Sequence, residues 1–128
     1  MPHLTVHALE SDLVGRETDL IEKLTDAVAA VYGTWARGIA VVQLIGLPAN
    51  RWGIGGTPAP APSPSVTFEI KEAVFSRPDA DEIVARLISD VTDAIVAVFG
   101  ERVRAGVTVD LVGTPPGRSG VGGVVVAS

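Results

Sequence analysis

Cysteine is missing from the sequence, and charged residues are few. The 128 residues contain no cysteine, and Asp, Glu, Lys and Arg together make up 20% of the chain. The lack of cysteine excludes disulfides and thiolate metal sites, and it fits a reducing compartment. Because 47% of the residues are apolar, there is ample material for a core, and we expect other subunits to cover part of the surface.

Clusters of basic residues and long apolar runs are also missing. The formal net charge is −5, and the scattered Lys and Arg residues offer no electrostatic footprint for nucleic acid or for an anionic membrane. No apolar run approaches the roughly 18 residues that span a bilayer, and no basic segment followed by an apolar one marks a signal peptide. We therefore expect a soluble, cytoplasmic protein with one domain over residues 1–128.

Metal and phosphate motifs are not recognisable either. The two histidines, His3 and His7, lack partners at metal-ligand spacing. The glycine-rich residues 53–56 lack the Lys-Ser/Thr pair and the strand-to-helix context of a phosphate loop. We expect neither a metal nor a cofactor.

The clearest positive signal is internal duplication. Residues 25–33 (TDAVAAVYG) return as residues 92–100 (TDAIVAVFG), an offset of 67 positions. The same offset places residues 51–56 (RWGIGG) onto residues 118–123 (RSGVGG). One shared register over this length predicts two structurally equivalent halves. We divide the chain into repeat 1 (2–56), a Pro-rich linker (57–65) and repeat 2 (66–128).

Each half is predicted to fold as strand, helix and strand. Runs of β-branched and apolar residues predict strands at 3–9, 66–75, near 40–46 and near 106–112. Apolar residues at three- and four-residue spacing predict one helix over 20–31 and its twin over 84–98, the latter introduced by Ser76-Arg77-Pro78-Asp79. Gly33 and Gly100 follow the last apolar residues, where a left-handed position ends a helix.

Two such units predict an α+β fold. The units should form a four-stranded, mainly parallel sheet with both helices on one face. The other face is then uncovered although it has apolar residues, so we expect oligomerisation there. Residues 51–56 and 118–123 predict tight hairpins at subunit edges, and 124–126 a short strand added to a neighbour. The linker is expected to be an extended, solvated polyproline II segment.

The start of the chain places a proline directly behind Met1. A small second residue normally lets the methionine be removed, which leaves Pro2 as a secondary amine at the start of a strand. An α-amino group titrates at roughly 7.7 to 8, and burial lowers this pKa by disfavouring the charged form. Pro2 is then a candidate general base, although the dipeptide alone favours a strand that simply begins with proline. If Met1 is retained, the Pro2 nitrogen is an amide and no base.

These residues resemble the tautomerase superfamily, which includes 4-oxalocrotonate tautomerase, macrophage migration inhibitory factor and malonate semialdehyde decarboxylase. The first half is similar to a whole 4-oxalocrotonate tautomerase chain, because it joins Pro2, His7, Leu9 and Glu10 to one helix, a second strand and the RWGIGG hairpin of residues 51–56. With the duplication, the resemblance covers nearly the whole chain. It implies a homotrimer of two-unit subunits, with sheets around a three-fold axis and helices outside, and catalysis without a cofactor.

The resemblance also implies a site. In this family the processed N-terminal proline, here Pro2, is the catalytic base or acid. Trp52 falls where the family has an aromatic residue lining the pocket. Arg77 falls in the segment where the malonate semialdehyde decarboxylase and cis-3-chloroacrylate dehalogenase branches have substrate-binding arginines, and a guanidinium suits a carboxylate. The alternatives are a Trp52 that packs at a subunit interface and an Arg77 that is an exposed arginine beside a helix start.

The sequence departs from the family at several positions. The arginine that opens the second strand of 4-oxalocrotonate tautomerase falls at Val41, and its first-loop arginine falls at Asp12. Arg37 lies shortly before Val41 and is a candidate substitute only if the strand register slips. The helper aspartate of the decarboxylase branch falls near Gly38, so that activity lacks a recognised partner.

The function predicted from these residues is a cofactor-independent keto–enol tautomerase of a small 2-oxo acid or its enol. Pro2 would move the proton and Arg77 would hold a carboxylate. One alternative keeps the fold but uses cationic Pro2 to hydrate, dehalogenate or decarboxylate a three-carbon acid. Another is a trimeric binding protein without turnover, which the missing arginines favour. Because Ser119 replaces Trp52 in the second half, which also lacks a free amine, we expect one working site in each subunit.

Overall fold

Four long strands form one sheet in the computed structural model, which describes residues 2–126. The order across the sheet is β2-β1-β5-β6. Both outer pairs are parallel, and the central pair β1–β5 is antiparallel. The strands are β1 (His3–Leu9), β2 (Val41–Leu47), β5 (Ser65–Lys71) and β6 (Thr108–Thr114). The predicted α+β fold with a mainly parallel sheet is confirmed.

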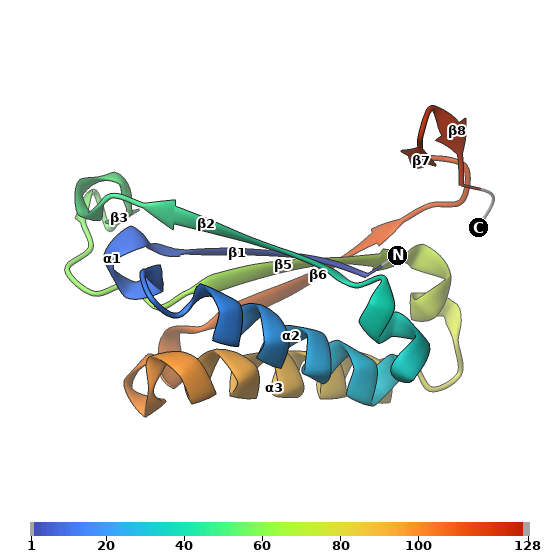
Figure 1. Ribbon diagram of the computed structural model, residues 1–128, viewed down its shortest axis with the longest axis horizontal. Coiled ribbons are helices and arrows are strands. Elements are labelled where there is room, and N and C mark those ends of the chain that lie inside the picture. Colours follow the sequence, from blue (N-terminus) through green and yellow to red (C-terminus); the bar gives the residue numbers. More distant parts are fainter. Residues whose placement is uncertain (1, 127–128) are drawn as a thin grey trace.

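Two long helices, α2 (Glu17–Tyr32) and α3 (Ala80–Phe99), lie side by side on one face of the sheet (Figure 1). Each helix connects two parallel strands, so the succession of strand, helix and strand occurs twice along the chain. Within residues 2–126, no helix is both long and apolar enough to cross a membrane. The short helical elements are α1 (Glu10–Leu13) and the 3-10 helices η1 (Thr34–Gly38), η2 (Ala49–Arg51), η3 (Glu72–Ser76) and η4 (Glu101–Gly106).

The core lies between the sheet and the two helices. Alternate residues of β1 and β5 point into it, as the period of two in a strand requires. The apolar residues that α2 and α3 repeat at three- and four-residue spacing meet them from the other layer. Its most buried large side chains are Leu4, Val6, Leu20, Leu24, Val28, Val66, Phe68, Leu87, Val91, Ile95 and Val103.

The opposite sheet face is more polar than expected. In the register of the central strands, Thr5 lies between Gln43 and Thr67, and Asp110 follows on the outer strand. Gln43 and Asp110 are exposed and both threonines are half-buried. The expectation of an apolar face came from the apolar content of the strands, but most of those apolar residues point into the core. The open face therefore offers polar groups for contact, with scattered apolar residues such as Ile45.

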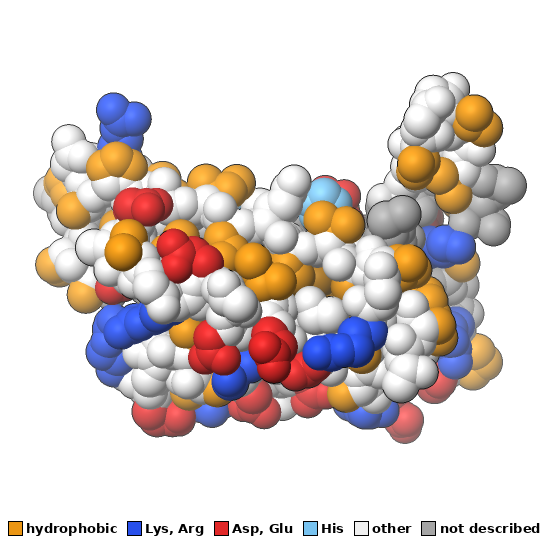
Figure 2. Space-filling view, viewed as in Figure 1, with side chains coloured by type: hydrophobic (Ala, Val, Ile, Leu, Met, Phe, Trp, Pro, Cys, Tyr) orange, Lys and Arg blue, Asp and Glu red, His pale blue; other side chains and the backbone are white. Residues whose placement is uncertain are grey.

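Two small hairpins extend beyond this open face at opposite ends of the sheet (Figures 1 and 2). They are β3 (Gly53–Ile54) with β4 (Thr57–Pro58), and β7 (Gly120–Val121) with β8 (Val124–Val125). Their turns use Gly-Gly pairs with positive φ, 64° and 88° in the first and 60° and 83° in the second, which is the backbone of a tight hairpin turn. Both hairpins are confirmed, but β8 pairs with β7 of its own chain.

Three further expectations need correction. The strand predicted over 66–75 ends at Lys71, because residues 72–76 turn into η3. Gly33 and Gly100 have positive φ as predicted. Their ψ angles of 166° and 162° place them in an extended region that essentially only glycine adopts, not in the left-handed helical region. The linker is not wholly solvated: its buried residues are Ala59, Pro62 and Pro64.

A glycine near the end of β6 makes close packing possible. A Cβ atom added to Gly113 would lie 2.8 Å from Phe75 Cε2 and 3.1 Å from the Glu72 Cα atom. We expect Gly113→Ala to lower the free energy of unfolding by about 1–3 kcal/mol, because η3 must shift to admit the methyl group. Gly38→Ala is the control, since a Cβ atom there meets nothing within 4 Å. Urea denaturation at fixed protein concentration measures both, and equal midpoints for the two variants would contradict the packing argument.

Candidate active site around Pro2

The register of the sheet places Pro2 beside the end of β5. His3 lies opposite Glu69 in the antiparallel pair, so the start of β1 and the end of β5 meet at one edge. The Pro2 carbonyl oxygen accepts a hydrogen bond from Val41 N at 2.9 Å, which fixes the backbone of this residue. Pro2 is buried. The antiparallel junction thus determines which segments surround the Pro2 ring.

Pro2 lines a cavity of about 230 Å³. This volume lies below the roughly 300–1,000 Å³ of pockets for drug-sized ligands, so the cavity suits a small molecule. Its walls come from four places: the start of β1, the end of α2 with η1, the end of β5 with η3, and the segment before α3. The lining residues are Pro2, Tyr32, Trp35, Ile70, Lys71, Val74 and Arg77.

Arg77 is held in place by Asp79. Arg77 Nε donates to Asp79 Oδ1 at 3.0 Å and Nη2 donates to Oδ2 at 3.2 Å. This bidentate pair engages two of the five guanidinium N–H groups and leaves the others for a ligand. The hydrogen bonds from Arg77 lower the pKa of the Asp79 carboxyl. Asp79 therefore orients the guanidinium from outside the cavity.

The aromatic wall of the cavity is linked by a hydrogen bond. Trp35 Nε1 donates to the Tyr32 carbonyl oxygen at 2.7 Å, and the two rings pack edge to face with centroids 6.2 Å apart. The Tyr32 hydroxyl is buried and has no hydrogen-bond partner among the described residues. Burial raises the pKa of this phenol, while the nearby Arg77 charge lowers it by less. The hydroxyl is consequently neutral and protonated near pH 7.

The charge in this cavity favours an anion. Lys71 and Arg77 supply two cations to the lining described above, which contains no carboxylate, and Arg77 is paired with Asp79 outside the cavity. Ile70, Val74 and the aromatic rings supply apolar wall, where electrostatic attraction is stronger than in open water. No group of three or more His, Asp or Glu residues within 2–126 is arranged to bind a metal. A small carboxylate is the ligand that these groups fit best.

The other two candidates from the sequence do not line this cavity in a single chain. Arg37 pairs with Asp26 on α2, and both side chains are about half exposed. Trp52 lies at the far end of the sheet, where it borders a shallow hollow with His7 and Arg51. The structure therefore brings Pro2 and Arg77 together and leaves Arg37 and Trp52 apart from them.

The second half has its own counterpart of Pro2. β1 begins at His3 and β5 at Ser65, and each first residue pairs with the first residue of its parallel partner strand. Pro64, which precedes β5, is therefore equivalent to Pro2. Because Pro64 lies inside the chain and is fully buried, it has no free amine. The strand register identifies Pro2 and Pro64 as equivalent. The 67-residue offset that relates the two helices does not align these two prolines.

Side chains of the protein itself meet at this counterpart position. Phe99 takes the place of Tyr32, and the Arg16 guanidinium carbon lies 5.6 Å from the centre of the Phe99 ring. Arg102 pairs with Asp12 at 3.7 Å. These cations are already occupied by an aromatic ring and a carboxylate. The two ends of the sheet thus share a backbone arrangement. Of the two, the end at Pro2 has the candidate amine.

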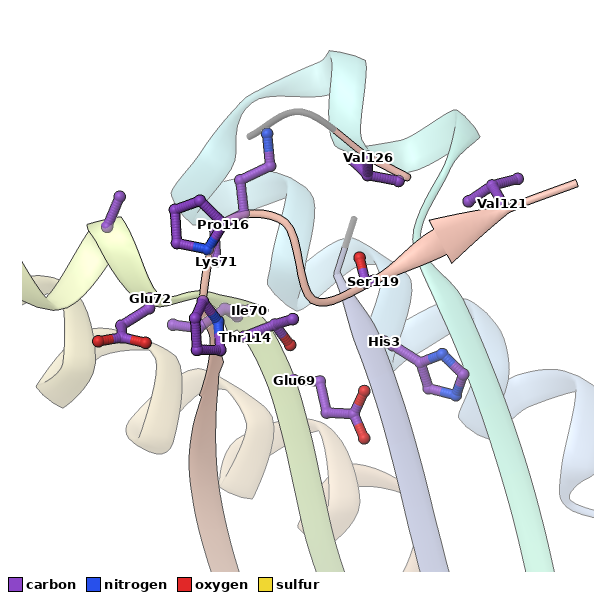
Figure 3. Close-up of a pocket in the computed structure, with 12 residues that line it drawn as sticks. His3, Glu69, Ile70, Lys71, Glu72, Thr114, Pro116, Ser119, Val121 and Val126 are labelled. Carbon is purple, nitrogen blue, oxygen red and sulfur yellow. The ribbon is translucent and has the colours of Figure 1, made fainter. Parts of the chain in front are cut away.

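A larger groove of about 480 Å³ lies on the open sheet face, between the strand ends and the β7–β8 hairpin (Figure 3). His3 and Glu69, which are paired across β1 and β5, point into it, and Ser119, Val121 and Val126 border it from the hairpin. The groove shares the Lys71 segment with the Pro2 cavity but does not include Pro2. The groove is therefore separate from the candidate site around Pro2.

Comparison with solved structures finds close matches over nearly the whole chain. The F6 fused 4-OT, described as a wild-type asymmetric trimer, is 28% identical, with a TM-score of 0.81 over 96% of this chain and 94% of that one. Pt0534 inactivated by 2-oxo-3-pentynoate is 22% identical, with a TM-score of 0.81 over 98% and 95%. N1, a member of the cis-3-chloroacrylic acid dehalogenase family, is 16% identical, with a TM-score of 0.78 over 97% and 82%.

The chain has the fold of the tautomerase superfamily. The resemblance stated from the sequence is thereby confirmed. No protein-family profile matches the chain, and no curated protein does either. The likeness to fused 4-OT supports an enzyme of the tautomerase superfamily in general terms, without selecting its reaction.

Besides the aliphatic residues Ile70 and Val74, three lining residues of the cavity were not predicted from the sequence: Tyr32, Trp35 and Lys71. A signal for two of them exists in the duplication. At the 67-residue offset Tyr32 corresponds to Phe99 and Trp35 corresponds to Arg102. Both residues therefore differ between the half that begins with a proline amine and the half that does not. Lys71 is set by the strand register, because it ends β5 beside the start of β1.

The Arg77–Asp79 pair predicts a specific titration. We expect Asp79 to titrate below its ordinary value of about 3.9 in carboxyl NMR, because Arg77 favours the charged form. Its stabilising contribution is present above the ordinary pKa and is lost as the pH falls through the lowered value. Arg77→Gln should return the Asp79 pKa to its ordinary range, whereas Lys71→Gln should not. An Asp79 pKa that is the same in Arg77→Gln as in wild type would contradict the claim that Arg77 lowers it.

Proposed function

We propose that the protein is a cofactor-independent keto–enol tautomerase that acts on a small 2-oxo acid or its enol. The observation that supports this most is the shared cavity: Pro2 and Arg77, which are distant in sequence, line one small pocket. Pro2 is the general base once Met1 has been removed, and Arg77 binds the substrate carboxylate. The similarity to fused 4-OT agrees with this class of enzyme.

The proposed proton transfer needs only one residue. In ketonisation the Pro2 nitrogen takes the proton of the enol hydroxyl, and the oxygen lone pair forms the C2 carbonyl. The electron pair of the C2–C3 double bond then takes a proton from the Pro2 cation, which restores the neutral amine. Lys71 and Arg77 disfavour a positive charge on Pro2, so the local charge supports a base more than a permanently cationic proline.

We also propose that the working form is a homotrimer. The fused 4-OT structures are described as trimers, and the two hairpins of this chain extend away from its own sheet (Figure 1). In such an assembly Trp52 can reach a neighbouring subunit and form part of the pocket or of the interface. The expected partners are a small carboxylate-bearing substrate and further copies of the chain.

Hydration, dehalogenation or decarboxylation with a cationic Pro2 is the alternative reaction on the same fold. It shares the carboxylate contact with Arg77 and differs in the protonation state of Pro2. Binding without turnover is the remaining alternative. The pH dependence of activity separates a neutral Pro2 from a cationic one, and the absence of turnover would mark a binding protein.

Removal of the Pro2 ring should abolish most turnover. We expect Pro2→Ala to lower kcat/KM for the ketonisation of phenylenolpyruvate by roughly 100-fold or more, the usual contribution of a positioned general base. The assay follows ultraviolet absorbance, and mass spectrometry verifies that both proteins lack Met1. Pro64→Ala is the matched control, because this proline has the equivalent position without a free amine. Equal rates in wild type and Pro2→Ala, or no turnover in either, would contradict the proposal.

Arg77 should act mainly through substrate binding. We expect Arg77→Gln to raise KM about tenfold or more, since a charge-assisted contact to the carboxylate is lost. Arg37→Gln makes the same change at an arginine that lies outside the cavity of its own chain, and its KM should stay unchanged. A rise in KM for Arg37→Gln alone would instead assign the carboxylate to Arg37, the candidate that the sequence allowed only with a slip in the strand register.

A further inference from the structure

We propose that the Tyr32 hydroxyl is a catalytic hydrogen-bond donor to the C2 oxygen of the substrate. This assignment rests on the proposed function, because it concerns the same cavity. In it, Arg77 binds the carboxylate, Tyr32 binds the adjacent oxygen, and Pro2 transfers the proton. The three groups come from three separate segments that line one pocket.

The first support is an unmet hydrogen bond. The Tyr32 oxygen is buried and has no partner among residues 2–126. Most buried polar atoms in proteins are paired, and an unpaired one is expected to have a reason. Because Tyr32 is also a lining residue of the Pro2 cavity, a ligand oxygen bound there can supply the missing acceptor.

The second support comes from the duplicated half. Phe99 has the same place at the end of α3 that Tyr32 has at the end of α2. Phe99 is buried and packs beneath Arg16 without any hydroxyl. The fold therefore needs an aromatic ring at this place, but not a phenol oxygen. The oxygen is present only in the half that has the candidate amine.

The third support is the state of the phenol. Burial raises its pKa, so it stays protonated and can donate at the pH where Pro2 acts as a base. The Trp35 hydrogen bond to the Tyr32 carbonyl oxygen restrains the end of the helix. A fixed donor of this kind stabilises negative charge that develops on the C2 oxygen when the enol proton leaves. Tyr32 donates a hydrogen bond and keeps its proton throughout.

The test compares two ligands that differ only in the C2 oxygen, 2-oxobutanoate and butanoate. Isothermal titration calorimetry with Met1-free protein should give tighter binding of 2-oxobutanoate to wild type. Tyr32→Phe should lower the affinity for 2-oxobutanoate about tenfold, as expected for one lost hydrogen bond, and leave butanoate unchanged. Its kcat for phenylenolpyruvate should fall about 100-fold, while its melting temperature stays equal or rises.

Two results would overturn the assignment, and they can be told apart. If Tyr32→Phe weakens both ligands equally, or neither, while wild type binds both, then Tyr32 is structural and the carboxylate pocket stands. If wild type binds neither ligand, the proposed carboxylate pocket fails and the Tyr32 assignment fails with it. Loss of folding does not confuse the outcome, because the melting temperature and the butanoate affinity of Tyr32→Phe report whether the variant is folded.

Discussion

The antiparallel contact between β1 and β5 is the constraint on which the rest of the structure depends. Each β-α-β unit is parallel within itself, so only this central pair brings the start of one unit to the end of a strand from the other. It places Pro2 beside Lys71 and the η3 segment that precedes Arg77. A cavity with a candidate amine and two cations follows from that junction, although no segment of ten residues contains them together.

The two halves of the chain have the same backbone arrangement around Pro2 and Pro64, but the side chains there differ. At the first end the strand starts near the chain terminus, and the cations face a small cavity. At the second end Pro64 is internal, Arg16 lies over Phe99, and Arg102 pairs with Asp12. The cations thus line a cavity in one half and make contacts within the chain in the other. This asymmetry is the physical reason to expect a site in the first half and none in the second.

The sequence predicted the elements well and the site in part. Helix periodicity and the repeated TDAxxAVxG segment located α2 and α3, and the Gly-Gly pairs located both hairpins. Pro2 and Arg77 were named because they match a family pattern. Tyr32, Trp35 and Lys71 were not, since the side chains that surround Pro2 depend on strand register across the two halves, which periodicity within one segment does not specify. The expectation for the open face was also too apolar, because alternation directs most strand aliphatic residues inward.

The pH dependence of kcat/KM for ketonisation of a generic enol by Met1-free protein tests the central claim most directly, because it reports the ionisation of the free enzyme. If Pro2 is a neutral amine base in a cavity that contains two cations, activity should fall as the pH drops through a single pKa at or below about 7.7. Activity that instead falls as the pH rises through that pKa would show that the cationic form of Pro2 is the active one, and would contradict the account.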